Sequence, residues 1–334
     1  MTIHECLPDS GIVFESLLMR DVVGLMEQAA ASRVGVMIAG EPGTGRGLVA
    51  RTIHACACAD GAPFVTVDGE SLPSSEAERL VFGVPGSGHG NGGPRSPRAP
   101  EVVYAGSLLH QALGGTVFFR RLEELPARVQ ARLATLFRDR EFTERLRGEA
   151  LPFTARPMAA ADPNGQALVD EGRVRLDLHR RFAEFRIELP PLRERRADIP
   201  SLAQFFVARA CREREMAEKV LECSTLALLS AMPWHGNSRE LRDLLDGLVQ
   251  ATPEGTITLQ ALLDHVSLEG RGHPSPALCA SLREARARFE REYIAAVVAQ
   301  HHGRIPDAAR SLGIQRTNLY RKLRALRLAR PTTV

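Results

Sequence analysis

A glycine-rich turn between an apolar run and a helical pattern constrains this chain most. It reads Gly40-Glu41-Pro42-Gly43-Thr44-Gly45-Arg46-Gly47, after the apolar segment 34–39 and before a helical pattern that begins at Leu48. Strand, turn and helix in this order are typical of a phosphate-binding loop, whose backbone N–H groups and helix N-terminus face an anion. The pattern normally ends in Lys and then Ser or Thr. Here a guanidinium (Arg46) replaces the ammonium, and Gly47 lacks the hydroxyl that would hold Mg²⁺.

Composition narrows the class of protein. The 334 residues allow two or three domains, and 44% hydrophobic and 25% charged residues are ordinary for a soluble globular chain. No apolar run approaches the roughly 20 residues of a membrane span, and the first ten residues carry no signal-peptide core. We therefore expect a cytoplasmic protein without membrane contact. The six cysteines lack paired metal-ligand spacing, so we expect reduced thiols and no metal site.

Predicted strands and helices alternate through the first half of the chain. Strands are expected over 34–39, 63–67, 116–119 and 153–161, and further helices over 11–30, 76–82, 106–113 and 128–137. This alternation predicts an α/β fold with a parallel sheet covered on both faces. Segment 83–100 contains six Gly and four Pro, which predict a surface loop.

Strand patterns stop after residues 189–195. Helical patterns follow over 199–216, 223–232, 238–252 and 259–266, which predict a small all-helical unit. A short linker rich in Gly, His, Pro and Ser comes next. The expected domains are therefore an α/β domain over 1–192, a helical unit over 193–268, a linker over 269–280 and a last domain over 281–334.

The C-terminal segment carries a concentrated positive charge. From Ser281 to Val334 there are 12 Lys and Arg against 4 Asp and Glu, whereas the whole chain is only +3. Such a basic segment on a mildly acidic body indicates a polyanionic partner. Residues 305–328 read as a short helix, a turn at Gly313 and a second helix, and the amphipathic pattern at 282–299 favours a dimer.

The second helix of this pattern offers polar side chains suited to DNA. Those near its N-terminus are of types that read base edges in the major groove, whereas the later basic residues suit phosphates. The candidate DNA-binding residues are Gln315, Arg316, Thr317, Asn318, Arg321, Lys322 and Arg324.

From about residue 12 to 328 the chain resembles the bacterial enhancer-binding proteins, the AAA+ activators of sigma-54 RNA polymerase. Residues 40–47 resemble Walker A, 114–122 the Walker B segment, 189–195 and 198–200 the junction with the lid, 234–241 the sensor II helix, and the C-terminus a Fis-type helix-turn-helix. The resemblance implies a P-loop AAA+ domain, a helical lid and nucleotide contacts from the turn and from Arg239. Arg175 and Arg181 match the family's inter-subunit arginine fingers, and we expect them to hold subunit or lid contacts through ion pairs.

Several positions depart from the family pattern. The family ends its Walker B strand in Asp-Glu, for Mg²⁺ and for the attacking water, whereas this chain has Arg120 and Arg121. Asp68 and Asp162 stand where the family has Asn. The loop of sequence GAFTGA that grips sigma-54 is replaced by 86–93, which has no aromatic residue and no Thr. We therefore predict a degenerate member with no catalytic residues, which neither hydrolyses ATP nor remodels sigma-54 polymerase.

The leading hypothesis is a sequence-specific transcriptional regulator whose AAA+ body serves oligomerisation, as a dimer or a ring, and signal reception. It would act on promoter DNA by recruiting or blocking the RNA polymerase holoenzyme. Because no receiver domain precedes residue 12, we expect a signal to enter through this body or through a separate signalling protein. Two alternatives stay open: an ATP-hydrolysing activator with displaced catalytic groups, and an adaptor that docks another regulator.

The three arginines at the degenerate positions leave the ligand question open. They make the site more positive than that of an ordinary ATPase, so ATP, ADP or cyclic di-GMP could bind without Mg²⁺. Cyclic di-GMP is a candidate ligand because some degenerate relatives in the family respond to it. The alternative is that the arginines form internal salt bridges and the pocket stays empty.

Overall fold

The computed structural model describes residues 12–58, 61–83, 101–143, 150–253, 255–268, 282–301 and 303–325. The chain divides into two compact units, of which the first holds residues 1–12 and 18–190 and the second holds residues 13–17 and 191–334. The glycine-rich segment 86–93 and the predicted linker 269–280 lie outside the described residues.

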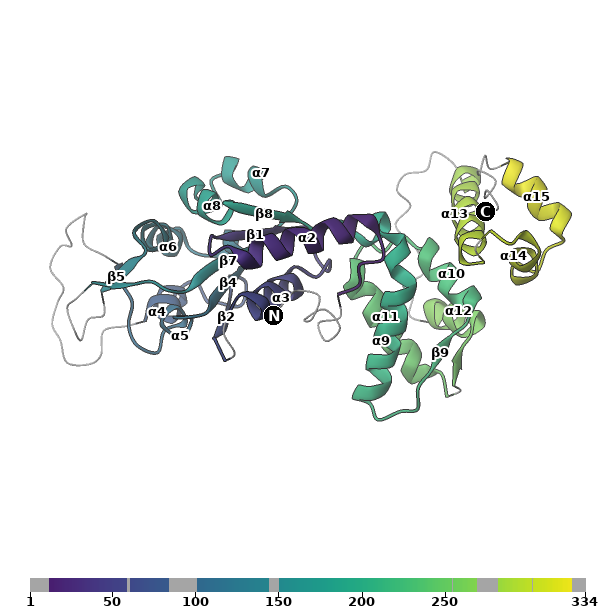
Figure 1. The fold of residues 1–334 in the computed structure, drawn as a ribbon, viewed down its shortest axis with the longest axis horizontal. Coiled ribbons are helices and arrows are strands. Elements are labelled where there is room, and N and C mark those ends of the chain that lie inside the picture. The colour runs from purple at the N-terminus through teal and green to yellow at the C-terminus, as the bar shows by residue number, and fades with distance from the viewer. Residues whose placement is uncertain are drawn as a thin grey trace. The chain divides into compact units, whose positions relative to one another are not determined.

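A five-stranded parallel sheet forms the centre of the first unit (Figure 1). Its order is β2-β4-β7-β1-β8, and the strands are β1 (Val36–Ala39), β2 (Phe64–Asp68), β4 (Thr116–Arg120), β7 (Arg156–Ala161) and β8 (Phe185–Glu188). All four residues of β1 are buried, which explains its continuous apolar sequence. The predicted α/β class with a parallel sheet is thus confirmed, although β8 was not predicted.

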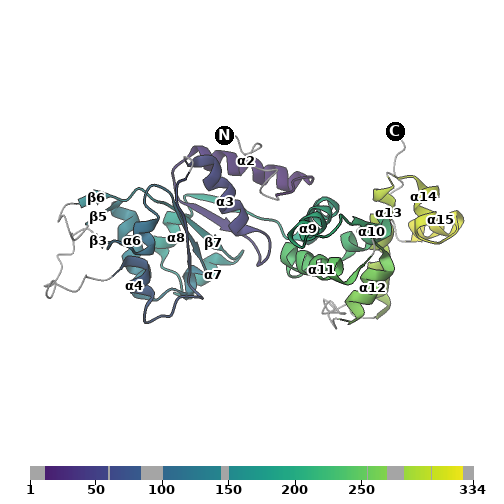
Figure 2. The ribbon, with the colours of Figure 1, turned by 90° about the horizontal axis from the view of Figure 1, so that it is seen from below.

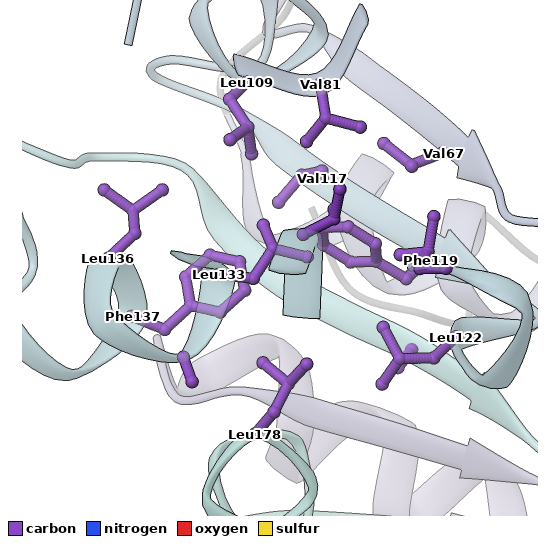
Figure 3. Packing of buried hydrophobic residues seen from close by; sticks show 14 of the residues in the cluster. Val67, Val81, Leu109, Val117, Phe119, Leu122, Leu133, Leu136, Phe137 and Leu178 are labelled. Carbon is purple, nitrogen blue, oxygen red and sulfur yellow. The ribbon is translucent and has the colours of Figure 1, made fainter. Parts of the chain in front are cut away.

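Helices cover both faces of this sheet. They are α2 (Leu17–Ala31), α3 (Arg46–Ala57), α4 (Ala77–Phe82), α5 (Leu108–Gln111), α6 (Ala127–Asp139), α7 (Gly165–Asp170) and α8 (Leu176–Phe182). Figure 2 shows α2 and α3 on one side of the sheet and α4 and α6 on the other. Along β4, Phe118 lies next to α3, whereas Phe119 belongs to the core under α6 and α8. Figure 3 shows this core, in which Leu133 and Phe137 of α6 face Val117 and Phe119.

Two boundaries in the first unit differ from the sequence prediction. The first helix starts at Leu17 rather than residue 11, because Ser16 N and Oγ donate to the two carboxylate oxygens of Asp198 at 2.7 and 2.8 Å. The fourth predicted strand starts at Arg156 rather than 153. Residues 101–152 also contribute a small, unpredicted sheet of β3 (Glu101–Val102), β5 (Glu141–Thr143) and β6 (Ala150–Pro152).

The second unit is mainly helical. Its first part contains α9 (Ile199–Glu213), α10 (Cys223–Ala231), α11 (Asn237–Ala251) and α12 (Leu259–Leu268), packed around the buried Trp234. A short parallel pair, β9 (Val220–Leu221) with β10 (Thr256–Ile257), corrects the prediction that strands stop after residue 195. The C-terminal part consists of α13 (Leu282–Gln300), α14 (Ile305–Ser311) and α15 (Arg316–Ala325), with Ala227 of α10 packed against its core.

The core under α6 supplies a stability test. Leu133 is fully buried, so Leu133→Ala should lower the free energy of unfolding by about 2–5 kcal/mol through lost burial and a residual cavity. Leu263→Ala is the matched control, because Leu263 is 44% exposed. Urea denaturation followed by circular dichroism measures both, and equal losses in the two variants would contradict the assigned core.

A phosphate-binding loop with inverted charge and a helix-turn-helix

The glycine-rich turn joins β1 to α3 at the carboxyl edge of the sheet. Gly43 and Gly45 have φ angles of 83° and 105°, in the left-handed region that favours glycine. Gly40 N donates to Ala161 O at 3.1 Å, and a Cβ on Gly40 would lie only 3.0 Å from Leu189 Cβ. The turn therefore packs closely on the ends of β7 and β8 and presents the N-terminus of α3.

Arg46 binds the end of the neighbouring strand. Its Nη1 donates to Ala161 O at 2.8 Å and to Asp162 Oδ1 at 2.6 Å. The guanidinium is 20% exposed and the carboxylate 48%. The side chain at the phosphate-lysine position is thus held by two acceptors within the protein.

Arg120 and Arg121 also face carboxylates. Arg120 ends β4, and its Nη1 lies 3.2 Å from Oδ2 of Asp68, its register partner on β2. Arg121 has a left-handed φ of 50°, and its Nη1 lies 2.6 Å from Glu70 Oε1. These are the internal salt bridges that one alternative anticipated. Each of Arg46, Arg120 and Arg121 is thus paired with an acid.

Sequence reasoning missed Glu70, which the sheet brings to Arg121. Gly69 N donates to Arg120 O at 2.9 Å, and a Cβ on Gly69 would approach Arg121 O to 2.3 Å. Only glycine permits this approach of the two strand ends. The Asp68-Gly69-Glu70 sequence directly after a strand is the signal that could have indicated the turn.

The three ion pairs set the charge of the site more than its stability. In each pair at least one partner is close to half exposed, and such pairs contribute about 0–1 kcal/mol to stability.

Magnesium prefers several oxygen ligands. The acids at this edge, Asp68, Glu70 and Asp162, each face a guanidinium, so the residues do not fit a magnesium ion. In the described ranges, no three His, Cys, Asp or Glu side chains gather as a metal-binding group.

The other arginines singled out from the sequence lie elsewhere. Arg175 donates through Nε and Nη2 to the carboxylate of Asp177 at 3.0 and 2.7 Å, which lowers the pKa of Asp177. Arg181 Nη1 lies 3.2 Å from Glu184 Oε1. Both arginines line a cavity of about 440 Å³ beside α8. Arg239 is exposed in the first turn of α11, in the second unit.

The C-terminal helices form a compact helix-turn-helix. Gly313 has a φ of 64° at the turn, and Ile314 N donates to Ala309 O at 3.1 Å. Leu319 of α15 is fully buried against α13 and α14, and Leu323 is 7% exposed. This packing leaves the opposite face of α15 accessible. Of the candidate DNA-binding residues, those exposed are Gln315, Arg316, Thr317 and Arg321.

Contacts within the C-terminal helices already involve some of the candidate DNA-binding side chains. Lys322 forms an ion pair with Glu290 of α13, so part of its charge is already compensated. Asn318 is half-buried and accepts from Arg321 Nη2 at 3.3 Å. The backbone of Arg324 lies in α15. Sequence reasoning missed Tyr320, which is 38% exposed and lies 5.8 Å below the Arg316 guanidinium; their spacing of four residues was the available signal.

The fold and these two sites define a class: a P-loop AAA+ domain with a helical lid and a helix-turn-helix. The family model described as "Sigma-54 interaction domain" matches residues 12–188. The models described as "AAA+ ATPase lid domain" and "Bacterial regulatory protein, Fis family" match residues 193–277 and 285–326. The chain therefore belongs to the sigma-54 interaction domain family, among transcriptional regulators with a Fis-type DNA-binding domain. In the described parts of the chain, no helix has the length and apolar character to cross a membrane.

Similar proteins include regulators of known name. The DNA-binding transcriptional regulator NtrC of Escherichia coli K12 is 31% identical over 341 residues, which cover 96% of this chain and 71% of that protein. NtrX of Azorhizobium caulinodans is 30% identical over 312 residues, covering 90% and 66%. The crystal structure of Brucella abortus NtrX with ADP has a TM-score of 0.69 at 28% identity, covering 95% and 70%, and its ATP complex scores 0.69 at 27% identity with the same coverage.

The Lys322–Glu290 pair gives a prediction for DNA binding. Glu290→Gln should raise affinity for all DNA and steepen the slope of log K against log salt by about 0.9, because one more cation becomes available to phosphate. Asp307→Asn removes the same charge from α14, where Asp307 pairs with the exposed Arg310, and should leave the slope nearly unchanged. Fluorescence anisotropy over a salt series measures both slopes. Identical slopes in both variants and the parent would count against a phosphate-directed Lys322.

Proposed function

We propose that this protein is a sequence-specific DNA-binding transcriptional regulator whose AAA+ domain does not hydrolyse ATP. The observation that carries the proposal is the pairing of Arg120 and Arg121 with Asp68 and Glu70 at the end of β4. Carboxylates at this strand end would hold Mg²⁺ and orient water. Arg120 and Arg121, each paired with an acid, can neither hold Mg²⁺ nor orient the attacking water.

The requirements of phosphoryl transfer explain why these ion pairs matter. Catalysis in P-loop enzymes rests on positioning and on neutralising charge, with the metal and a water-orienting group as main contributors. Restoring a metal site here would require breaking ion pairs and then removing two guanidinium groups. The left-handed φ angles of Gly43 and Gly45 support a turn that can still bind phosphate, so we propose binding without hydrolysis.

The retained loop supports metal-free nucleotide binding as a second proposal. Structures of Brucella abortus NtrX are described with ADP and with ATP. For this chain we propose ATP or ADP, or cyclic di-GMP as a signal, bound without Mg²⁺ by residues 40–47. A phosphate would then compete with Asp162 for Arg46, so weak affinity is expected.

We propose a homo-oligomeric assembly on promoter DNA, with the RNA polymerase holoenzyme and a separate signalling protein as further partners. Arg175 and Arg181 support an inter-subunit role because their positions match the family's arginine fingers and they lie at the wall of a surface cavity. Within this chain they pair with Asp177 and Glu184, and we propose that the two arginines serve subunit contacts rather than catalysis.

A phosphate-release assay tests the absence of hydrolysis. The purified full chain with ATP and Mg²⁺ should release no phosphate above background, and Arg46→Lys should not restore release, because the metal ligands are still missing. Gly47→Thr can be added, since a Cβ there meets only Phe118 Cε1 at 3.7 Å. Turnover by the parent protein, retained or raised in Arg46→Lys, would establish the alternative of a working ATPase with displaced groups.

DNA recognition is tested at α15. Arg316→Ala or Asn318→Ala should relax sequence preference by about 1–3 kcal/mol per lost base contact. Lys322→Ala should weaken binding to all sequences alike and flatten the salt dependence. Footprinting and competition on a selected binding site separate the two effects, and equal binding of every sequence by the intact protein would refute the assignment.

A further inference from the structure

A second basic cavity lies at the amino edge of the parallel sheet, opposite the phosphate-binding loop. It has a volume of about 330 Å³ and is formed where strands begin, by Gly35 before β1, Gly115 before β4 and Arg156 at the start of β7. Because β1, β4 and β7 run parallel, the loop at their carboxyl ends belongs to the other edge. The volume is at the lower end of the range for small-ligand sites.

The charge of this cavity is strongly positive. Its charged lining residues are four arginines and one glutamate: Arg33, Arg140, Arg156, Arg181 and Glu184. Glu184 accepts from Arg181 at 3.2 Å. Across the described residues, no carboxylate lies within ion-pair distance of the other three arginines. Among the described residues, three guanidinium groups thus line one cavity without a paired carboxylate.

Arg156 is the buried member of this group. It is only 7% exposed; its Nε donates to Val34 O at 3.0 Å and its Nη2 to Ala29 O at 2.6 Å. Nη1 is buried and has no hydrogen-bond partner among the described residues. Burial lowers the pKa of Arg156. A buried cation without a paired anion is costly, so an anion in the cavity would lower this cost through its negative charge, without contact with the fully buried Nη1.

We propose that this cavity binds a small organic phosphate. A phosphate group offers two negative charges and several acceptor oxygens, which match planar guanidinium donors better than a single carboxylate does. Phe137 and Phe153, whose ring centroids are 5.8 Å apart, also line the cavity and offer apolar surface to the body of such a molecule. The site is distinct from residues 40–47 and does not depend on whether those residues bind nucleotide.

Cys58 provides a direct readout, because its half-buried thiol lies in the wall of this cavity. AMP serves as the probe, and adenosine, which lacks the phosphate, is the matched control. AMP should slow iodoacetamide alkylation of Cys58 in the full chain, as followed by peptide mass spectrometry, and adenosine should not. The exposed Cys223 of α10 should react at the same rate throughout.

Variants separate this cavity from the phosphate-binding loop. Arg33→Gln, at an exposed position that leaves the core intact, should weaken AMP binding in calorimetry about ten- to a hundredfold, as expected for one lost charge-assisted contact. Arg51→Gln, on α3 beside Phe64 and outside the cavity, and Arg46→Gln, in the loop, should leave Cys58 protection unchanged.

Three outcomes would overturn the proposal. The first is no protection of Cys58 at saturating AMP, the second is an unchanged AMP affinity in Arg33→Gln, and the third is loss of protection in Arg46→Gln. None of these bears on hydrolysis by the loop, so failure here leaves the proposed function standing.

Discussion

The parallel pairing of β2, β4, β7 and β1 decides which residues meet at the two edges of the sheet in the first unit. It gathers the carboxyl ends of the strands at one edge, so the glycine-rich turn meets Asp162 after β7, and Arg120 meets Asp68 across β2 and β4. The amino ends gather at the other edge, where Arg156 lies. A shift of one strand would break these ion pairs, because register decides which side chains meet.

The carboxyl edge of the sheet pairs three arginines with three acids. Cations occupy positions of the loop and of β4, and acids on the adjoining strands and turn lie opposite them. Exposed ion pairs of this kind change the free energy of unfolding little. Their effect is chemical, because they give this edge arginines whose charge is compensated by neighbouring acids. The amino edge differs, since no acid among the described residues forms an ion pair with the buried guanidinium of Arg156.

Sequence reasoning worked best where one local rule dominates. The strand, turn and helix around residues 40–47 follow from glycine conformation and apolar patterning, and the helix-turn-helix follows from Gly313 and the spacing of leucines. It failed where pairing partners are distant. β8 has only Ile187 buried and two charged residues in four, so its sequence hardly differs from a loop. The pairs β9–β10 and β5–β6 are two or three residues long, too short for a periodic pattern.

The sequence by itself determined the order of the domains, the glycine-rich turn, the basic C-terminal segment and the arginines at Arg46, Arg120 and Arg121. Only the tertiary structure decided what those arginines contact, because Glu70, Asp68 and Asp162 reach them across the sheet. It also decided that Lys322 pairs with Glu290, and that the residues before α2 bind Asp198 in the second unit. Residue types and local spacing can be read directly from a sequence, whereas a contact between distant residues depends on how strands and helices pack.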